Sequence, residues 1–150
     1  MIIGLHLWGC AGDRYEQKVG NIKMMVQSFY AHLEAGEADQ AVFANQQIET
    51  VALESEEYLL RRVGQMSQAD RTREWKVIKT AKQTAAENWL ALARYFSQAQ
   101  EYQRARGAYQ RLIETYQDPI YQSYVERART GLRDVDLMLS PEERGQPVKK

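Results

Sequence analysis

Apolar residues recur every three or four positions along most of this chain, which is the spacing of one face of an α-helix. The first such stripe consists of Tyr15, Val19, Ile22, Val26, Phe29 and Leu33. Gly36 follows in the segment EAGEADQA and interrupts the pattern. The spacing therefore predicts a helix that buries one face and ends just before this glycine.

Four further stretches repeat the pattern between residues that start or stop helices. We expect helices over about 37–63, 71–98, 101–116 and 120–139. Ser67 or Asp70 is the expected N-cap of the helix at 71–98, and Pro119 ends the preceding helix because proline disfavours a helical residue before it. The chain is thus predicted to be all-α, with about five antiparallel helices in one domain over 13–140. The polar segment 141–150 is expected to be a mobile tail.

The helix expected over 37–63 carries apolar residues on two of its faces. They are Ala41, Ala44, Ile48 and Val51 on one side, and Leu53 and Leu60 on the other. A helix with two apolar faces is typical of an element packed between two neighbours. We therefore expect this helix to pack between two neighbouring helices.

The segment AENWLALARYFSQAQEYQRARGAYQRLIETYQDP has the most specific pattern of large and small residues. The positions that carry the pattern are Trp89, Leu92, Ala93 and Phe96 in its first helix, and Tyr102, Ala105, Tyr109 and Leu112 in its second. Two alanines allow the helix backbones to approach, while the aromatic residues fill the space around them. This order resembles a tetratricopeptide repeat, a helix–turn–helix unit of about 34 residues. The closing proline stands two positions later than in that family.

The resemblance covers residues 86–119 and implies a stack of helical hairpins. A degenerate hairpin at 19–63 would precede the clear unit, and the helix at 120–139 would cap it, because one unit cannot bury its apolar face alone. A plain helical bundle that converged on the same spacing is the alternative.

The family also implies a function and a surface. Such repeats bind protein segments on their concave face, and the positions that match it are Glu87, Leu90, Arg94, Ser97 and Gln98. The expected function is a non-catalytic adaptor whose partners are one or more proteins. The alternative is a soluble helical subunit of a larger assembly, with a cytoplasmic location.

The start of the chain, MIIGLHLWGCAG, resembles the end of a bacterial lipoprotein leader. Leu7 takes the first position of the lipoprotein box, Gly9 precedes the cysteine, and Cys10 would be the lipidated residue. Trp8 is bulkier than usual, and no basic residue precedes the apolar run. Residues 1–12 would then be a leader remnant and tether. The implied address is the periplasmic face of a bacterial outer membrane, and two or more acyl chains would make the attachment stable.

The composition of the chain limits the partners, metal sites and activities that we expect. The 150 residues have a formal net charge of zero, which gives no overall bias toward nucleic acid or acidic membranes. The single cysteine excludes an internal disulfide and a cysteine-based zinc site. His6 and His32 stand apart from each other and from Cys10. No metal, no cofactor and no enzymatic activity are expected, because no catalytic motif or ligand spacing occurs.

Charged residues otherwise predict a solvated surface. Carboxylates stand beside Lys and Arg, as in ESEE at 54–57, which is followed by Arg61 and Arg62. The last two helices carry a series of arginines interleaved with tyrosines, namely Arg104, Arg106, Arg111, Arg127, Arg129 and Arg133. Acidic residues interrupt this series, so we expect a mixed surface and no nucleic-acid partner.

Overall fold

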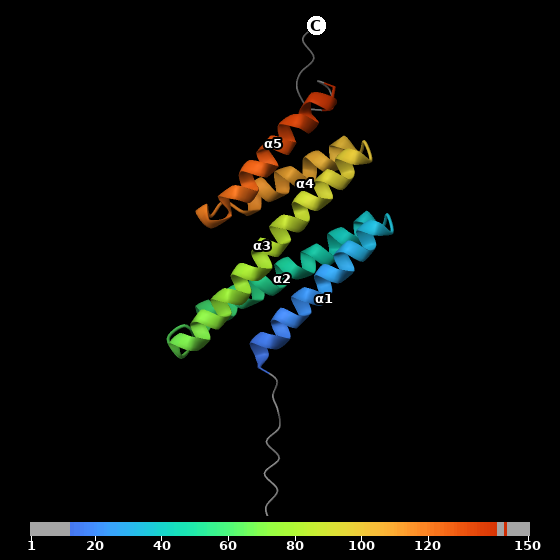
Figure 1. The fold of residues 1–150 in the computed structure, drawn as a ribbon. Helices are drawn as coiled ribbons and strands as arrows, with labels where there is room; N and C mark the ends of the chain where they lie inside the picture. The colour runs from blue at the N-terminus through green and yellow to red at the C-terminus, as the bar shows by residue number, and fades with distance from the viewer. Residues whose placement is uncertain (1–12, 141–142, 144–150) are drawn as a thin grey trace, which may run out of the picture.

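The computed structural model describes residues 13–140 and residue 143, and this part of the chain is helical throughout, with no strand (Figure 1). The elements are α1 (Arg14–Glu34), α2 (Ala38–Arg62), α3 (Gln68–Gln98), α4 (Tyr102–Thr115), the short 3-10 helix η1 (Pro119–Tyr121) and α5 (Gln122–Met138). The predicted all-α class with five helices is confirmed. Cys10, the segment 1–12 and the tail beyond Ser140, apart from residue 143, lie outside the described residues.

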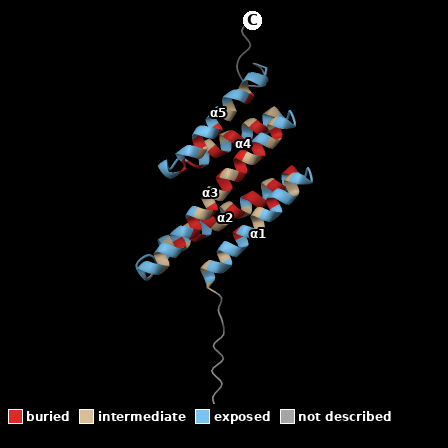
Figure 2. Ribbon diagram, in the orientation of Figure 1, coloured by how far each residue is buried: buried red, intermediate tan, exposed pale blue. Residues whose placement is uncertain are grey.

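The helices form a stack of antiparallel hairpins with α3 at its centre (Figure 1). The most extensive contacts join helices that are consecutive along the chain, and α3 also contacts α1 and α5. In Figure 2 the buried residues lie on the helix surfaces that face one another. The longest helix therefore joins the α1–α2 hairpin to the α4–α5 pair.

The turns of the α1–α2 and α3–α4 hairpins have the same backbone geometry. Gly36 (φ 76°) and Gln100 (φ 60°) occupy the left-handed region, which no other described residue does. In each turn the following glutamate donates its backbone N–H to a carbonyl in the last turn of the preceding helix, at 2.8 Å. These are the bonds of a helix C-terminal motif that places a left-handed residue just after the helix.

The two hairpins also bury the same register of positions. Five of the buried residues of α2 are Ala41, Ala44, Asn45, Ile48 and Ala52, and the matching buried residues of α4 and its C-cap are Ala105, Ala108, Tyr109, Leu112 and Tyr116. Each member of the first set lies 64 residues before its counterpart. The small residues Ala93 and Ala105 are fully buried, as expected where helix backbones approach closely.

The boundaries of two elements differ from the prediction by a few residues. Helix α3 begins three residues early, because the Ser67 side chain accepts a hydrogen bond from the N–H of Asp70 (3.1 Å) and caps the helix at this point. Beyond Pro119 the chain forms η1 before α5 starts, and the Asp118 carboxylate accepts from the N–H of Ile120 (3.0 Å). The connection between α4 and α5 is therefore a capped short helix.

Helix α2 packs between two neighbours, as predicted, but its second apolar face is left exposed. Leu53 is 58% exposed and Leu60 is 77% exposed. Helix α2 does lie between α1 and α3, but it turns small and polar residues toward them, including the fully buried Asn45 and Ser55. Asn45 donates its amide to the carbonyl of Ala85 (3.1 Å), so this buried polar group is satisfied.

The prediction of a wholly solvated set of carboxylates is wrong at one position. Glu74 of α3 is fully buried and binds Lys18 and Arg14 of α1, the latter at 3.1 Å. Lys18 also donates to the buried hydroxyl of Ser55 at 2.9 Å. A buried charge is tolerated when it is paired and hydrogen-bonded, so this cluster ties α1 to both of its neighbours.

Candidate functional site

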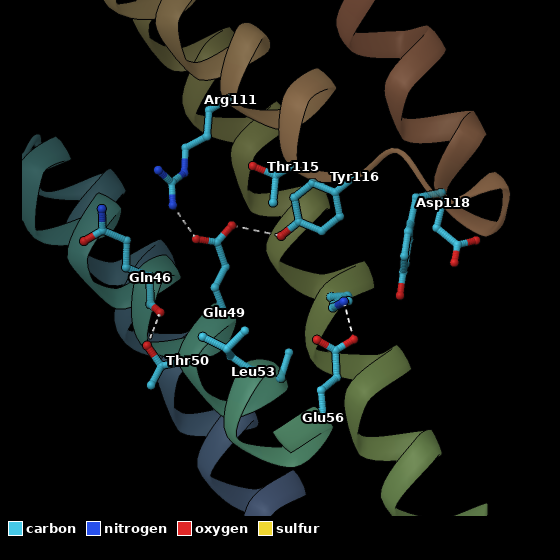
Figure 3. A pocket seen from close by; sticks show the side chains of 12 residues that line it. Gln46, Glu49, Thr50, Leu53, Glu56, Arg111, Thr115, Tyr116 and Asp118 are labelled. Carbon is cyan, nitrogen blue, oxygen red and sulfur yellow. Dashed lines mark hydrogen bonds and ion pairs between the residues drawn. The ribbon is translucent and has the colours of Figure 1, made fainter. Parts of the chain in front are cut away.

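An open groove with a volume of about 460 Å³ lies between α2 and α4, beside α3 (Figure 3). Its twelve lining residues are Gln46, Glu49, Thr50, Ala52, Leu53 and Glu56 of α2, Lys82 of α3, Arg111 and Thr115 of α4, and Tyr116, Asp118 and Tyr121 of the connection to α5. The groove is thus built where the first hairpin meets the second.

Glu49 holds the three helices around the groove together. Its carboxylate accepts hydrogen bonds from the Trp89 indole N–H (2.8 Å), the Tyr116 hydroxyl (3.0 Å) and the Arg111 guanidinium (2.8 Å). The Arg111 guanidinium also lies 4.8 Å from the centre of the Trp89 ring. Figure 3 shows Arg111 and Tyr116 converging on Glu49 from above. With three donors on one carboxylate, this wall of the groove is rigid and already satisfied.

Burial and the neighbouring Glu49 carboxylate together keep the Tyr116 hydroxyl protonated. Burial, followed by the charge of Glu49 and its hydrogen bond, raises the pKa of Tyr116 well above its usual range. The hydroxyl therefore keeps its proton and remains a donor to Glu49 at any physiological pH.

The middle of the groove presents an apolar surface beside a second ion pair. Leu53 is 58% exposed here, next to the buried Ala52. Glu56 of α2 pairs with Lys82 of α3. The Thr50 hydroxyl donates to the carbonyl of Gln46 one turn earlier (2.9 Å), so its proton is already used within the helix.

The end of the groove near α5 is formed by Asp118 and Tyr121. Burial, with the nearby carboxylates of Asp118 and Glu56, raises the pKa of Tyr121 to about 12. This hydroxyl is therefore neutral at physiological pH. Asp118 is exposed at the rim, where it caps η1.

The residues predicted for partner binding do not line this groove. They are Glu87, Leu90, Arg94, Ser97 and Gln98. Arg94 and Gln98 are exposed and Ser97 is partly buried, all on α3. Glu87 stands two positions before Trp89, the α3 residue that donates to Glu49, and two positions correspond to about 200° around the helix axis. Glu87 and Arg94 thus lie on a side of α3 that faces α5.

The prediction that Leu90 contacts a partner is wrong, because only 1% of this residue is exposed. A helix at the centre of a stack is covered by neighbours on most of its circumference, and Leu90 belongs to the core cluster that results. It therefore lies beneath the surface at which a partner could contact it.

On the α5 side of α3, Glu87 forms an ion pair with a residue of α5. Both of its carboxylate oxygens accept from the Arg127 guanidinium of α5, at 3.0 Å each. Arg94 borders a shallow depression with Glu126, Arg127 and Thr130. Each of its four lining residues carries a charge or a hydroxyl, so none of them is an exposed apolar side chain that could anchor a partner.

The arginines of the last two helices are distributed among partners, as expected for a mixed surface. Arg106 pairs with Asp136 at 3.0 Å, and Arg129 pairs with Glu126 at 2.8 Å. Arg104 pairs with Asp39 and Glu101. The positive charge on this side of the molecule is thus largely matched by carboxylates.

Within residues 13–140, no three His, Cys, Asp or Glu side chains are grouped closely enough to hold a metal ion. The same part of the chain contains no helix with the length and apolar character needed to cross a bilayer.

Sequence reasoning missed the groove, although one signal pointed to it. The second apolar face of α2, with Leu53 and Leu60, has no covering helix in the structure. Glu49, Arg111 and Tyr116 gave no such signal, because they lie far apart along the chain and meet only where the hairpins stack. Comparison of the chain with protein-family models, curated proteins and solved structures finds no match.

Proposed function

We propose that this protein is a non-catalytic adaptor that binds a segment of another protein in the groove between α2 and α4. The observation that carries the proposal is the exposed Leu53 within an otherwise organised groove. An apolar side chain left in water inside a concave surface gains free energy when a partner covers it. The volume of the groove falls within the range of ligand-binding pockets, about 300–1,000 Å³.

The polar groups around Leu53 favour a binding role for the groove over a catalytic role. Glu49 accepts from three donors and Glu56 is paired with Lys82, so these carboxylates already have partners. Such a wall is organised before a ligand arrives, which reduces the ordering cost of association. A bound segment would therefore gain affinity from an apolar anchor placed against Leu53.

Selection of a displayed random-peptide library on the purified protein tests this function. We expect peptides that share an apolar residue and whose affinity falls at least about tenfold for Leu53→Asp, because the anchor would then meet a charge. Leu60→Asp is the matched control, since Leu60 is an exposed leucine of the same helix that does not line the groove. Circular dichroism verifies that both variants remain helical.

The proposal is wrong if no peptide is selected, or if the selected peptides bind wild type and Leu53→Asp equally. Peptides that lose affinity for Arg94→Glu instead would favour the α3–α5 surface expected from the repeat resemblance.

We further propose that Cys10 anchors the adaptor to the periplasmic face of a bacterial outer membrane. The LWGC sequence supports this proposal, and helix α1 begins at Arg14, only four residues after the cysteine. Intact-mass measurement on protein from its native cells should find a chain that begins at Cys10 and carries acyl groups. A chain that begins at Met1 with a free thiol would refute the anchor and favour a soluble subunit of a larger assembly.

A further inference from the structure

We propose that the segment bound in the groove carries a lysine or arginine next to its apolar anchor, and that this cation binds at the Asp118 end. The inference rests on the proposed function and adds a direction to it: the cationic side chain lies toward the α4–α5 connection, and the anchor lies on Leu53.

The first argument is the balance of charge in the groove. Three carboxylates and two cations line it. Arg111 is matched by Glu49 (2.8 Å) and Lys82 by Glu56. Among the residues that the structure describes, Asp118 has no Lys, Arg or His nitrogen within 4 Å, the distance that defines the other pairs. One negative charge of the groove is therefore left for a ligand.

The second argument is that Asp118 is held in place. One of its oxygens, Oδ1, accepts from the N–H of Ile120 (3.0 Å) and caps η1, and Pro119 restricts the backbone that follows. The other oxygen makes no hydrogen bond within the described residues. A fixed carboxylate with one free oxygen at the rim of a groove is a suitable acceptor for an ammonium or guanidinium group.

The third argument is the character of the surrounding end of the groove. The Tyr121 hydroxyl lines it together with Asp118 and Glu56. Burial, followed by the charges of Asp118 and Glu56, raises the pKa of Tyr121, so this hydroxyl stays protonated. A cation entering here meets the Asp118 carboxylate and a neutral hydroxyl, whereas Glu56 is already paired with Lys82.

The opposite end of the groove does not offer the same attraction. In Figure 3, Asp118 lies on the far side of Tyr116 from Arg111 and Gln46. The carboxylate at that end, Glu49, already accepts from three donors. Complementary charge would therefore orient the bound segment rather than supply most of its affinity.

The test uses the peptides selected on the full-length protein. Each peptide is synthesised with its Lys or Arg and again with Gln at that position, and calorimetry measures both against wild type and Asp118→Asn. Asparagine still caps η1, so the fold is preserved. We expect Asp118→Asn to weaken the cationic peptide about two- to fivefold, the range of an exposed ion pair. The Gln peptide should not distinguish the two proteins.

Asp134→Asn is the matched control, because it removes the same charge from an exposed position of α5 outside the groove. Raising the salt concentration should reduce the difference between wild type and Asp118→Asn. If the peptides depend on Leu53 but show no preference for a cation, or if both Asn variants behave alike, this inference is overturned and the proposed function stands. If no peptide depends on Leu53, both are overturned.

Discussion

A single residue, Gln100, carries a backbone conformation that its side chain disfavours. It occupies the left-handed region at φ 60°, where the equivalent turn of the first hairpin has Gly36. A residue with a Cβ is strained there and glycine is not. We therefore expect Gln100→Gly to raise the free energy of unfolding by about 0.5–1 kcal/mol, measured by urea denaturation. Gly36→Ala should lower it by about 1 kcal/mol.

The surroundings of Gly36 make this comparison informative. A Cβ atom added there would lie 3.7 Å from the Tyr95 hydroxyl, which is ordinary contact. Any loss in Gly36→Ala thus reports the backbone angle and not a clash. Gln98→Gly, at the last residue of α3, serves as the control and should be neutral or destabilising. A Gln100→Gly variant that is no more stable than wild type would contradict the interpretation.

At the scale of elements, α4 and α5 approach each other through a glycine. A Cβ atom on Gly131 of α5 would lie 2.3 Å from the ring of Tyr109 in α4. Gly131→Ala should therefore lower the free energy of unfolding by about 1–3 kcal/mol, the usual cost of overpacking, although alanine is the better helix former. Thermal unfolding followed by circular dichroism measures the change.

Two further variants separate packing from helix propensity. Gly107 lies within α4, and an added Cβ there would meet nothing within 4 Å, so Gly107→Ala should stabilise the protein by about 0.5–1 kcal/mol. In a Tyr109→Leu background the cost of Gly131→Ala should shrink, because the ring is gone. An unchanged cost in that background would rule out the proposed contact.

At the scale of the whole molecule, buried tyrosines couple the fold to alkaline pH. Burial is the largest cause of the raised pKa values of Tyr109, Tyr116 and Tyr121. Above pH 10, the ordinary value for tyrosine, the unfolded chain loses these protons while the folded chain keeps them, so stability falls as the pH rises from about 10 to 12. Urea denaturation across this interval should show the decline.

Ultraviolet titration provides the direct check of this pH dependence. The folded protein should ionise part of its nine tyrosines only above pH 10, whereas protein in urea should titrate them together near that value. Superimposable curves for the folded and unfolded protein would refute the burial argument.

Features that depend on local spacing could be predicted from the sequence, and features that depend on the packing of distant segments could not. The helices, their order and the close-approach alanines follow from local spacing, so they were predictable. The full burial of Glu74 and Leu90 was not, because it depends on how α1 and α3 cross and on how many neighbours α3 has. The groove could not be predicted either, because Glu49, Arg111 and Tyr116 meet only when the hairpins stack.

The order in which the helices pack has a kinetic consequence. Because the helices contact mainly their neighbours along the chain, most of the contacts between helices join consecutive elements. Short loops close quickly, and helical proteins rich in local contacts fold within microseconds to milliseconds. The chain can thus assemble hairpin by hairpin, and a force that pulls its two ends apart would release the helices one after another, from the outermost inward.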